Sequence, residues 1–190
     1  MGAGSSGTVS EKIDDLVTKT YFDRKELKLW YKGFYKECPS GRLTKDEFDK
    51  IYREFFPQGK VESFSQHIFN VFDTKKSGFI DYVDFVTFLS IASRGSIEEK
   101  LNWAFKILDV NNSGSVKKQE MLSVIESMQE MLSNFTDIVS TENSPQSRVD
   151  KIYELLDKKE DEAIRLEEFV SACSRDPSVC QSLSLYDGFI

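Results

Sequence analysis

The sequence is poor in the residues that most enzymes and metal centres use. It has one histidine, His67, and three cysteines, Cys38, Cys173 and Cys180, whose number is odd and whose spacing fits no metal site. We therefore expect neither a disulfide framework nor a thiolate-bound metal, and we predict a reduced cytosolic chain. No nucleophile and base can be paired around a lone histidine that lies in a helical pattern, so we predict that the protein is not an enzyme.

Long apolar runs and an excess of basic residues are also missing. No stretch approaches the roughly 18 apolar residues of a membrane span, and the first residues lack the apolar core of a signal peptide. The 25 basic and 32 acidic residues give a net charge of -7. This charge argues against a nucleic-acid partner and suits an acidic protein that binds cations. We expect a soluble cytoplasmic protein, peripheral at membranes if a lipid anchors it.

One polar segment, 109–120, carries a recognisable ligand pattern. Side-chain oxygens recur at its positions 1, 3 and 5, a glycine that permits a sharp turn stands at position 6, and a carboxylate ends it at position 12. This is the spacing of an EF-hand calcium loop, in which position 7 contributes its backbone carbonyl. The predicted calcium ligands are Asp109, Asn111, Ser113, Ser115 and Glu120.

The same pattern recurs three more times along the chain. We call the four segments the first loop (36–47), the second loop (73–84), the third loop (109–120) and the fourth loop (157–168). An apolar residue stands at position 8 of each one, where a short strand can pair with a neighbouring loop: Leu43, Ile80, Val116 and Ile164. The loop starts are 37, 36 and 48 residues apart. The longer last interval predicts an inserted loop over Ser133–Ser147, which contains Pro145 and lacks helical periodicity.

Apolar residues at helical spacing flank each loop, and they predict an all-α fold. The four helix-loop-helix units should pair into two lobes, with short β pairing between loops. We predict a joining segment over Ser90–Ser96, followed by a new helix that Ser96 caps, with Glu98 and Glu99 in its first turn. The predicted divisions are an N-terminal segment, a first EF-hand pair, a second pair and a tail: 1–20, 21–92, 93–176 and 177–190.

The four loops differ in their capacity for calcium, which needs six or more oxygen ligands. The first loop begins with Lys36 and carries Cys38-Pro39 where a ligand should stand, so we predict a structural role. The fourth loop has Lys159 at position 3 and Glu162 in place of the turn glycine, which predicts weak binding or none.

The second loop is intermediate. Lys75 stands at its position 3, and an aspartate at position 12 reaches a bidentate geometry less readily than glutamate does. Its possible weak ligands, for magnesium if for any ion, are Asp73, Ser77, Asp81 and Asp84.

Only the third loop satisfies every position. It contains just two ligand carboxylates, and Lys117 and Lys118 add positive charge nearby. We therefore expect an affinity toward the weaker end of the sensor range of about 10⁻⁷ to 10⁻⁵ M. The alternative interpretation is a helix-turn-helix with a polar turn and no ion.

The first six residues, Met1–Ser6, match the pattern for removal of Met1 and myristoylation of Gly2. The same Gly/Ser-rich composition is typical of an expression linker, and the segment alone does not separate the two interpretations.

The chain resembles the neuronal calcium sensor family, and within it the frequenin branch, over nearly its whole length. The segments that carry the resemblance are Thr20–Phe22, Trp30–Phe34, Cys38–Gly41, Lys50–Arg53, Phe55–Pro57, Phe69–Asp73, Ser93–Gly95, Glu99–Leu101, Trp103–Phe105 and Leu183–Gly188. The resemblance implies a myristoylated four-EF-hand sensor, and it favours acylation of Gly2. Frequenin-like proteins use their second, third and fourth loops for calcium, so this sequence looks like a diverged member with degenerate loops.

The resemblance also implies an open apolar groove that receives an amphipathic helix of a target protein. The candidate groove residues are Trp30, Phe34, Phe48, Ile51, Tyr52, Phe55, Phe85 and Leu89. For any one of them, a place in the core is the simpler interpretation. By resemblance, the target would be a phosphatidylinositol 4-kinase, a channel, a receptor or a receptor kinase.

Three functions follow from the sequence. The first is a calcium sensor or adaptor that regulates a membrane-associated target. The second is a regulatory subunit that holds its target at all calcium levels. A calcium buffer comes last, because one competent loop of four gives little capacity.

Overall fold

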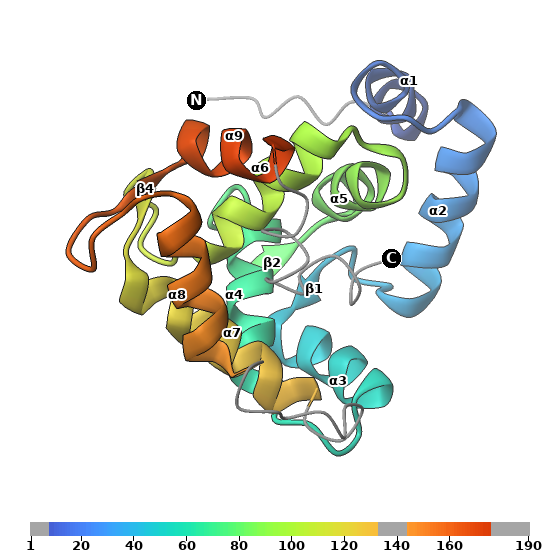
Figure 1. The fold of residues 1–190 in the computed structure, drawn as a ribbon. Coiled ribbons are helices and arrows are strands. Elements are labelled where there is room, and N and C mark those ends of the chain that lie inside the picture. The colour runs from blue at the N-terminus through green and yellow to red at the C-terminus, as the bar shows by residue number, and fades with distance from the viewer. Residues whose placement is uncertain (1–7, 133–143, 176–190) are drawn as a thin grey trace, which may run out of the picture.

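The computed structural model describes residues 8–132 and 144–175 (Figure 1). Helices dominate this part of the chain, with a two-residue strand within each loop. In order, the elements are α1 (Val9–Lys19), α2 (Arg24–Glu37), β1 (Leu43–Thr44), α3 (Lys45–Phe55), α4 (Val61–Phe72), β2 (Phe79–Ile80), α5 (Tyr82–Arg94), α6 (Ile97–Leu108), β3 (Ser115–Val116), α7 (Lys118–Leu132), α8 (Pro145–Leu155), β4 (Ile164–Arg165) and α9 (Leu166–Arg175).

Capping boxes begin many of these helices. In a capping box, the side chain of the residue before the helix accepts a hydrogen bond from a backbone amide in the first turn, and a carboxylate three residues later accepts one from the cap residue's own amide. The pairs are Thr8 with Glu11, Asp23 with Glu26, Thr44 with Glu47, Asp81 with Asp84, and Ser96 with Glu99. The predicted cap at Ser96 is thus confirmed, and two of the boxes use the residue at position 12 of a loop.

The strands pair two by two, as the apolar position-8 residues predict. Leu43 lies opposite Ile80, and Val116 lies opposite Ile164, both in antiparallel register. All four side chains are buried. The strand pairs therefore join the first loop to the second and the third loop to the fourth.

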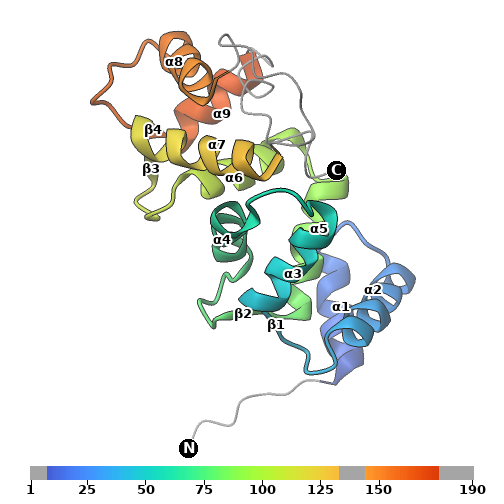
Figure 2. The same ribbon diagram turned by 90° about the horizontal axis from the view of Figure 1, so that it is seen from below.

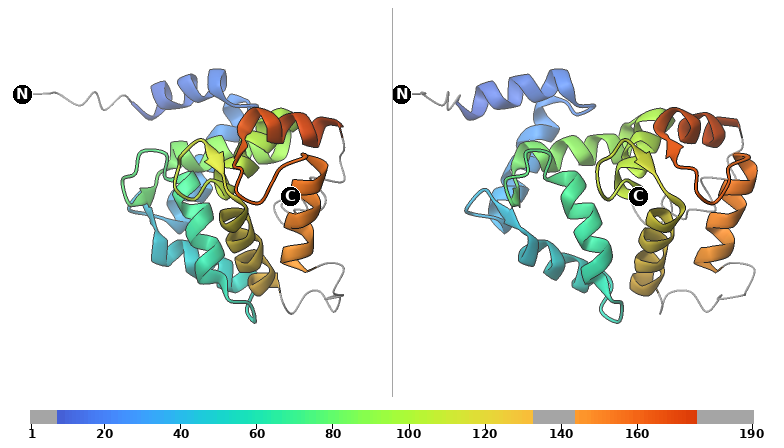
Figure 3. Two further views of the ribbon diagram at one scale, coloured as in Figure 1. Left: turned by 60° about the vertical axis from the view of Figure 1, so that its left-hand side comes forward. Right: turned by 90° about the vertical axis from the view of Figure 1, so that its left-hand side faces the viewer.

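The helices form two halves, with α1 to α5 in one and α6 to α9 in the other (Figure 2). The halves meet along α4, which contacts both α6 and α7, and these helices run close together in both views of Figure 3. Trp103 of α6 packs against two rings of the first half, 5.9 Å from Phe72 and 5.0 Å from Phe88 between centroids. One buried apolar cluster continues through both halves.

Two sequence-based boundaries are wrong. Ser90–Arg94 is not a joining segment, because α5 continues to Arg94 and only Gly95 and Ser96 separate it from α6. The inserted loop does not reach Ser147, because α8 begins at Pro145 with Ser144 as its cap. Proline suits the first turn of a helix, where its missing N–H costs nothing. The rest of the predicted insertion, 133–143, lies outside the described residues.

Helix α1 has no counterpart in the sequence-based divisions, which leave 1–20 without an element. Ile13 and Leu16 are buried, and α1 packs against α2 and α5. Gly2 and the tail from 177 onward lie outside the described residues. Within the described ranges, none of the helices has the length and apolar character needed to cross a membrane.

Candidate calcium-binding loops

The third loop has a backbone shaped by its first residue. Asp109 follows α6 directly, and its two carboxylate oxygens accept hydrogen bonds from the amides of Ser113 and Gly114, both at 2.9 Å. Gly114 has φ +80° and Asn112 has φ +55°, so the chain turns through the left-handed region twice. Glycine and asparagine tolerate that region best, which explains why these residue types occur here.

The five predicted calcium ligands of the third loop lie together. The Ser113 hydroxyl donates to the Ser115 carbonyl at 2.7 Å and lies 3.4 Å from Asp109 Oδ1. Asn111 accepts from the Ser113 amide at 2.9 Å, and its side-chain amide donates to Glu120 Oε1. Carboxylate, amide, hydroxyl and carbonyl oxygens therefore converge, and this donor set fits calcium.

Neutral oxygens supply most of that set. Among the residues that the structure describes, no three His, Cys, Asp or Glu side chains gather into a metal-binding group. The second oxygen of Glu120 accepts from the Lys117 amide at 2.9 Å, so this carboxylate also caps α7. A calcium ion would take the place of the neutral amide of Asn111 at Glu120 Oε1.

Lys118, which sequence reasoning treated as unfavourable to the third loop, is paired with the fourth unit. Its ammonium lies 2.8 Å from Asp150 and 2.8 Å from Glu160, and 5.6 Å from the centre of the Tyr153 ring. These bonds, led by the one to Asp150, raise the pKa of Lys118. The partners are distant in sequence, so no local pattern could have identified them.

Tyr153 is a further residue that sequence reasoning missed. Its hydroxyl lies 3.1 Å from the Glu162 carbonyl and 3.4 Å from the Val116 carbonyl, so it joins the third and fourth loops. Burial raises the pKa of Tyr153 to about 12. From the sequence, Tyr153 is predictable only as part of the apolar face of a helix.

The second loop repeats the turn of the third. Asp73 accepts from the amides of Ser77 at 2.8 Å and Gly78 at 2.7 Å, and Gly78 has φ +82°. Its predicted weak ligands therefore also lie together, but the Lys75 ammonium donates to Asp81 and lies 3.4 Å from Asp84.

Burial opposes the charge on Lys75, yet its bonds to Asp81 and Asp84 raise its pKa. The pKa of Asp84 is also raised, because burial outweighs the hydrogen bond from Thr74. The Lys75 ammonium thus remains charged beside two ligand carboxylates of the second loop.

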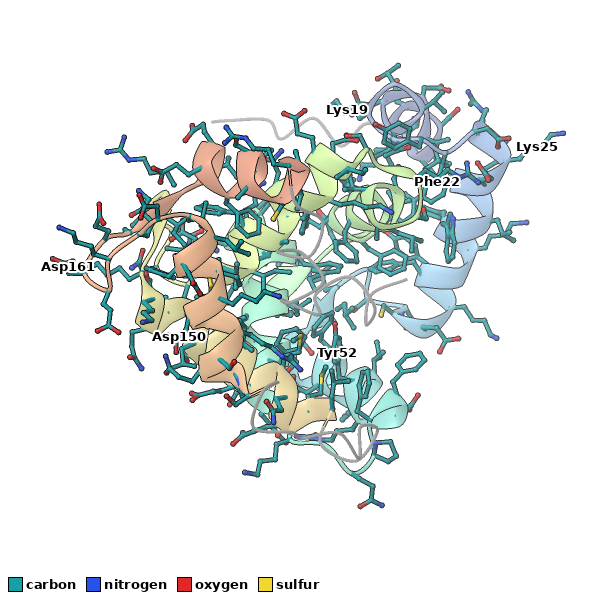
Figure 4. All side chains as sticks on the ribbon, in the orientation of Figure 1. Lys19, Phe22, Lys25, Tyr52, Asp150 and Asp161 are labelled. Carbon is teal, nitrogen blue, oxygen red and sulfur yellow. The ribbon has the colours of Figure 1, made fainter. Side chains whose placement is uncertain are left out.

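The fourth loop departs from this geometry. Asp157 has φ +52°, whereas Asp73 and Asp109 have φ of -74° and -79°. The Lys158 ammonium donates to Glu168 Oε1 at 2.7 Å, and this bond lowers the pKa of Glu168. Lys159, which stands at a ligand position, was predicted to weaken this loop, whereas the contact of Lys158 was not predicted. Figure 4 shows Asp161 at the outer edge of this loop.

The first loop has no ligand set for a cation. Cys38 is buried where α2 ends, and burial raises the pKa of its thiol. Glu47, at position 12, accepts from the amide and hydroxyl of Thr44 at 2.8 and 2.9 Å. This loop contributes β1 and a helix cap.

The predicted groove residues divide into buried and exposed side chains. Phe34 and Phe48 are buried, each 6% exposed, and belong to the core cluster. Trp30, Ile51 and Phe55 are 37%, 38% and 69% exposed. The remaining three are partly buried against the core: Tyr52, Phe85 and Leu89. Figure 4 shows Tyr52 on α3.

The candidate groove residues lie in two aromatic groups on the first half. Phe85 lies 6.2 Å from Trp30 and 5.4 Å from Phe34 between ring centroids. Phe48 lies 4.9 Å from Tyr52, and the exposed side chains Ile51 and Phe55 belong to the same helix, α3. Apolar surface is thus exposed on α2 and α3.

Comparison with known proteins agrees with this arrangement. A family model described as an EF-hand domain pair matches residues 98–174, and an EF-hand model matches residues 66–89. A relative named Neuronal calcium sensor 1 from Lymnaea stagnalis is 41% identical over 187 residues, which cover 98% of each chain. The chain belongs to the neuronal calcium sensor family. A second Neuronal calcium sensor 1, from Aplysia californica, is 40% identical with the same coverage.

Membership of the neuronal calcium sensor family confirms the resemblance and the predicted fold class. Neuronal calcium sensors are calcium-binding regulators and not enzymes, so this chain is a regulatory protein. His67 is half-buried in α4, and burial lowers its pKa.

Proposed function

We propose that this protein senses calcium through its third loop and regulates a target protein by docking an amphipathic helix of that target. The observation that carries the proposal is the partner of Glu120. In the third loop, the carboxylate at position 12 contacts a neutral amide, whereas in the second and fourth loops it lies within reach of a lysine ammonium. Of these three loops, the third is therefore the one in which a calcium ion would not have to displace a lysine ammonium from the carboxylate at position 12.

The strand pair and Tyr153 supply a route from the ion to the helices. Val116 pairs with Ile164, and Tyr153 contacts the carbonyls of both loops, so a change in the third loop acts on the whole second half. Ion binding at an EF-hand changes the angle between its flanking helices and so biases groove exposure. The bias is limited by how differently calcium binds the two states.

The exposed apolar side chains of α2 and α3 are the proposed docking surface. The target is a membrane-associated kinase, receptor or channel, and a myristoyl group on Gly2 would bring the protein to the same membrane. A helix laid on this surface would bury its own apolar residues at i, i+3 or i+4, and i+7.

Calcium titration of the full chain by calorimetry tests the sensor. We expect one equivalent, lost in Glu120→Gln, because the bidentate carboxylate is removed while the side-chain shape stays. Glu126→Gln is the matched control, since it removes the same charge from an exposed site on the same helix. The proposal is contradicted if the wild-type protein binds no calcium, or if Glu120→Gln still binds one equivalent.

A second candidate is a regulatory subunit that holds its target at all calcium levels. The lysines in the second and fourth loops favour it, because their ammonium groups already contact the carboxylates at position 12 of these loops. Capture of the target with calcium and with chelator separates the two functions. Equal capture in both buffers selects the calcium-independent subunit, and capture lost on chelation selects the sensor.

A further inference from the structure

The carboxylate at position 12 has the same task in all four loops. One of its oxygens accepts a hydrogen bond from the backbone amide at position 9: Glu47 from Thr44 at 2.8 Å, Asp84 from Asp81 at 3.3 Å, Glu120 from Lys117 at 2.9 Å, and Glu168 from Arg165 at 2.9 Å. The carboxylate is thereby fixed as a helix cap. The loops differ in the group that contacts the rest of this carboxylate.

We propose that Lys75 and Lys158 are permanent internal cations, whose ammonium groups replace a metal ion in the second and fourth loops. Each loop is then held in its folded geometry at any calcium concentration. The proposal does not require that the third loop bind calcium, and it therefore stands apart from the proposed sensor function.

In the second loop, the predicted ligands lie together, but the Lys75 ammonium already neutralises part of their negative charge. The turn around Asp73 matches that of the third loop, hydrogen bond for hydrogen bond. The ammonium of Lys75 lies between the carboxylates of Asp81 and Asp84, and the Asp84 side chain is only 4% exposed. A divalent ion entering here would meet a fixed positive charge among its ligands. The second loop therefore does not fit calcium while Lys75 stays in place.

The fourth loop has a more enclosed lysine. The Lys158 side chain is 18% exposed, and its ammonium lies 2.7 Å from the Glu168 carboxylate. Asp157 has a left-handed backbone conformation. Within the described residues its carboxylate accepts no hydrogen bond from the backbone amides of the turn, whereas the carboxylates of Asp73 and Asp109 do. Lys158 supplies the positive charge that Glu168 would otherwise receive from an ion.

A tethered ammonium has a consequence for each half of the molecule. The second loop carries β2, which pairs with β1, and the fourth loop carries β4, which pairs with β3. If lysines hold these loops, both strand pairs persist without calcium, and the third loop binds its ion against a partner that is already formed. The calcium response should then be that of one independent site.

The test uses full-length protein with Glu120→Gln as background, so that the third loop is silent. In chelator, Lys75→Gln and Lys158→Gln should each lower the thermal midpoint, by about 2–4 °C for a loss typical of one interaction in a chain of this size. The matched controls are Lys50→Gln, at an exposed position on α3 of the same half, and Lys159→Gln, which removes the same charge from the neighbouring residue of the fourth loop. Lys75→Arg and Lys158→Arg keep the charge and should restore most of the midpoint.

Two results would overturn the proposal. The first is that Lys75→Gln and Lys158→Gln are as stable in chelator as their control variants. The other is calcium or magnesium binding by Glu120→Gln protein with both lysines intact, because that would place an ion in the second or fourth loop. If wild-type protein binds no calcium and yet the lysine variants lose stability, the sensor function fails while the internal cations are supported.

Discussion

Tyr153 joins the third and fourth loops outside the strand pair, in addition to the Lys118–Glu160 ion pair. Its hydroxyl reaches the carbonyls of Glu162 and Val116, and its ring lies beneath Lys118. A buried hydroxyl that satisfies backbone carbonyls contributes through the cost of leaving them unpaired as well as through the bond itself. This residue therefore affects the third loop without being a ligand.

Replacing Tyr153 by phenylalanine should test this link. We expect Tyr153→Phe to lose about 1 kcal/mol of stability and to weaken calcium binding a few-fold, because the strand partner of the third loop is less firmly held. Tyr52→Phe is the control, since the Tyr52 hydroxyl makes no hydrogen bond within the described residues. Thermal unfolding and calcium calorimetry measure both effects, and a variant equal to this control in both would show that the hydroxyl does not couple the loops.

At the scale of helices and strands, the repeat made much of the fold predictable. Position 8 of each loop identified the strands, because an apolar side chain within a polar loop is best buried where that loop pairs with another. The cap at Ser96 was predictable for a similar reason, since Ser followed by Glu three residues later is a local signal. The start of α8 was missed because Pro145 was included in a predicted loop without helical periodicity, whereas it occupies the first turn.

What the sequence could not show were contacts between distant residues. The predicted ligands of the third loop rest on spacing alone, but the partners of Lys118 come from other segments and depend on how the chain folds back. The burial of Phe34 and Phe48 likewise depends on packing between helices.

Arg94 ends α5 and holds α2 in place. Its guanidinium donates to the Tyr21 carbonyl at 2.9 Å and to Glu26, the capping carboxylate of α2, at 3.0 Å. This bond lowers the pKa of Glu26. A carboxylate whose pKa is lower in the folded than in the unfolded protein stabilises the fold fully at pH values above its unfolded-state pKa. This contribution is lost as the pH falls through its folded-state pKa.

Arg94→Gln should therefore destabilise the protein more at neutral pH than in acid. Below the ordinary glutamate pKa of about 4.3, Glu26 becomes protonated and the difference from wild type should shrink. Thermal midpoints measured across this pH range test the expectation. Lys25→Gln, at an exposed position on the same helix, serves as the control, and a difference that does not depend on pH would exclude Glu26 as the partner that matters.

At the scale of the whole molecule, the two halves approach closely at Gly59, in the turn between α3 and α4. A methyl group added there would lie 2.0 Å from the carbonyl oxygen of Met131 near the end of α7. The neighbouring Lys60 amide donates to the Glu130 carbonyl at 3.3 Å. The contact is thus between two backbones, which cannot yield as a flexible side chain would.

Gly59→Ala should consequently force the halves apart. We expect a loss of about 1–3 kcal/mol, the usual cost of overpacking, and a lower thermal midpoint. Gly33→Ala is the matched control: no atom lies within 4 Å of the added methyl, so alanine in the middle of α2 should raise stability by up to about 1 kcal/mol. Equal stability of the two variants would contradict the close approach.

The positions of the two tryptophans give the molecule separate optical reporters. Trp103 packs against Phe72 and Phe88 where the halves meet, whereas Trp30 is 37% exposed on the proposed docking surface. Indole emission depends on contact with water and on access by quenchers. Fluorescence from Trp30 therefore reports what covers α2, fluorescence from Trp103 reports the junction of the halves, and a Trp30→Phe variant isolates the second signal without any added dye.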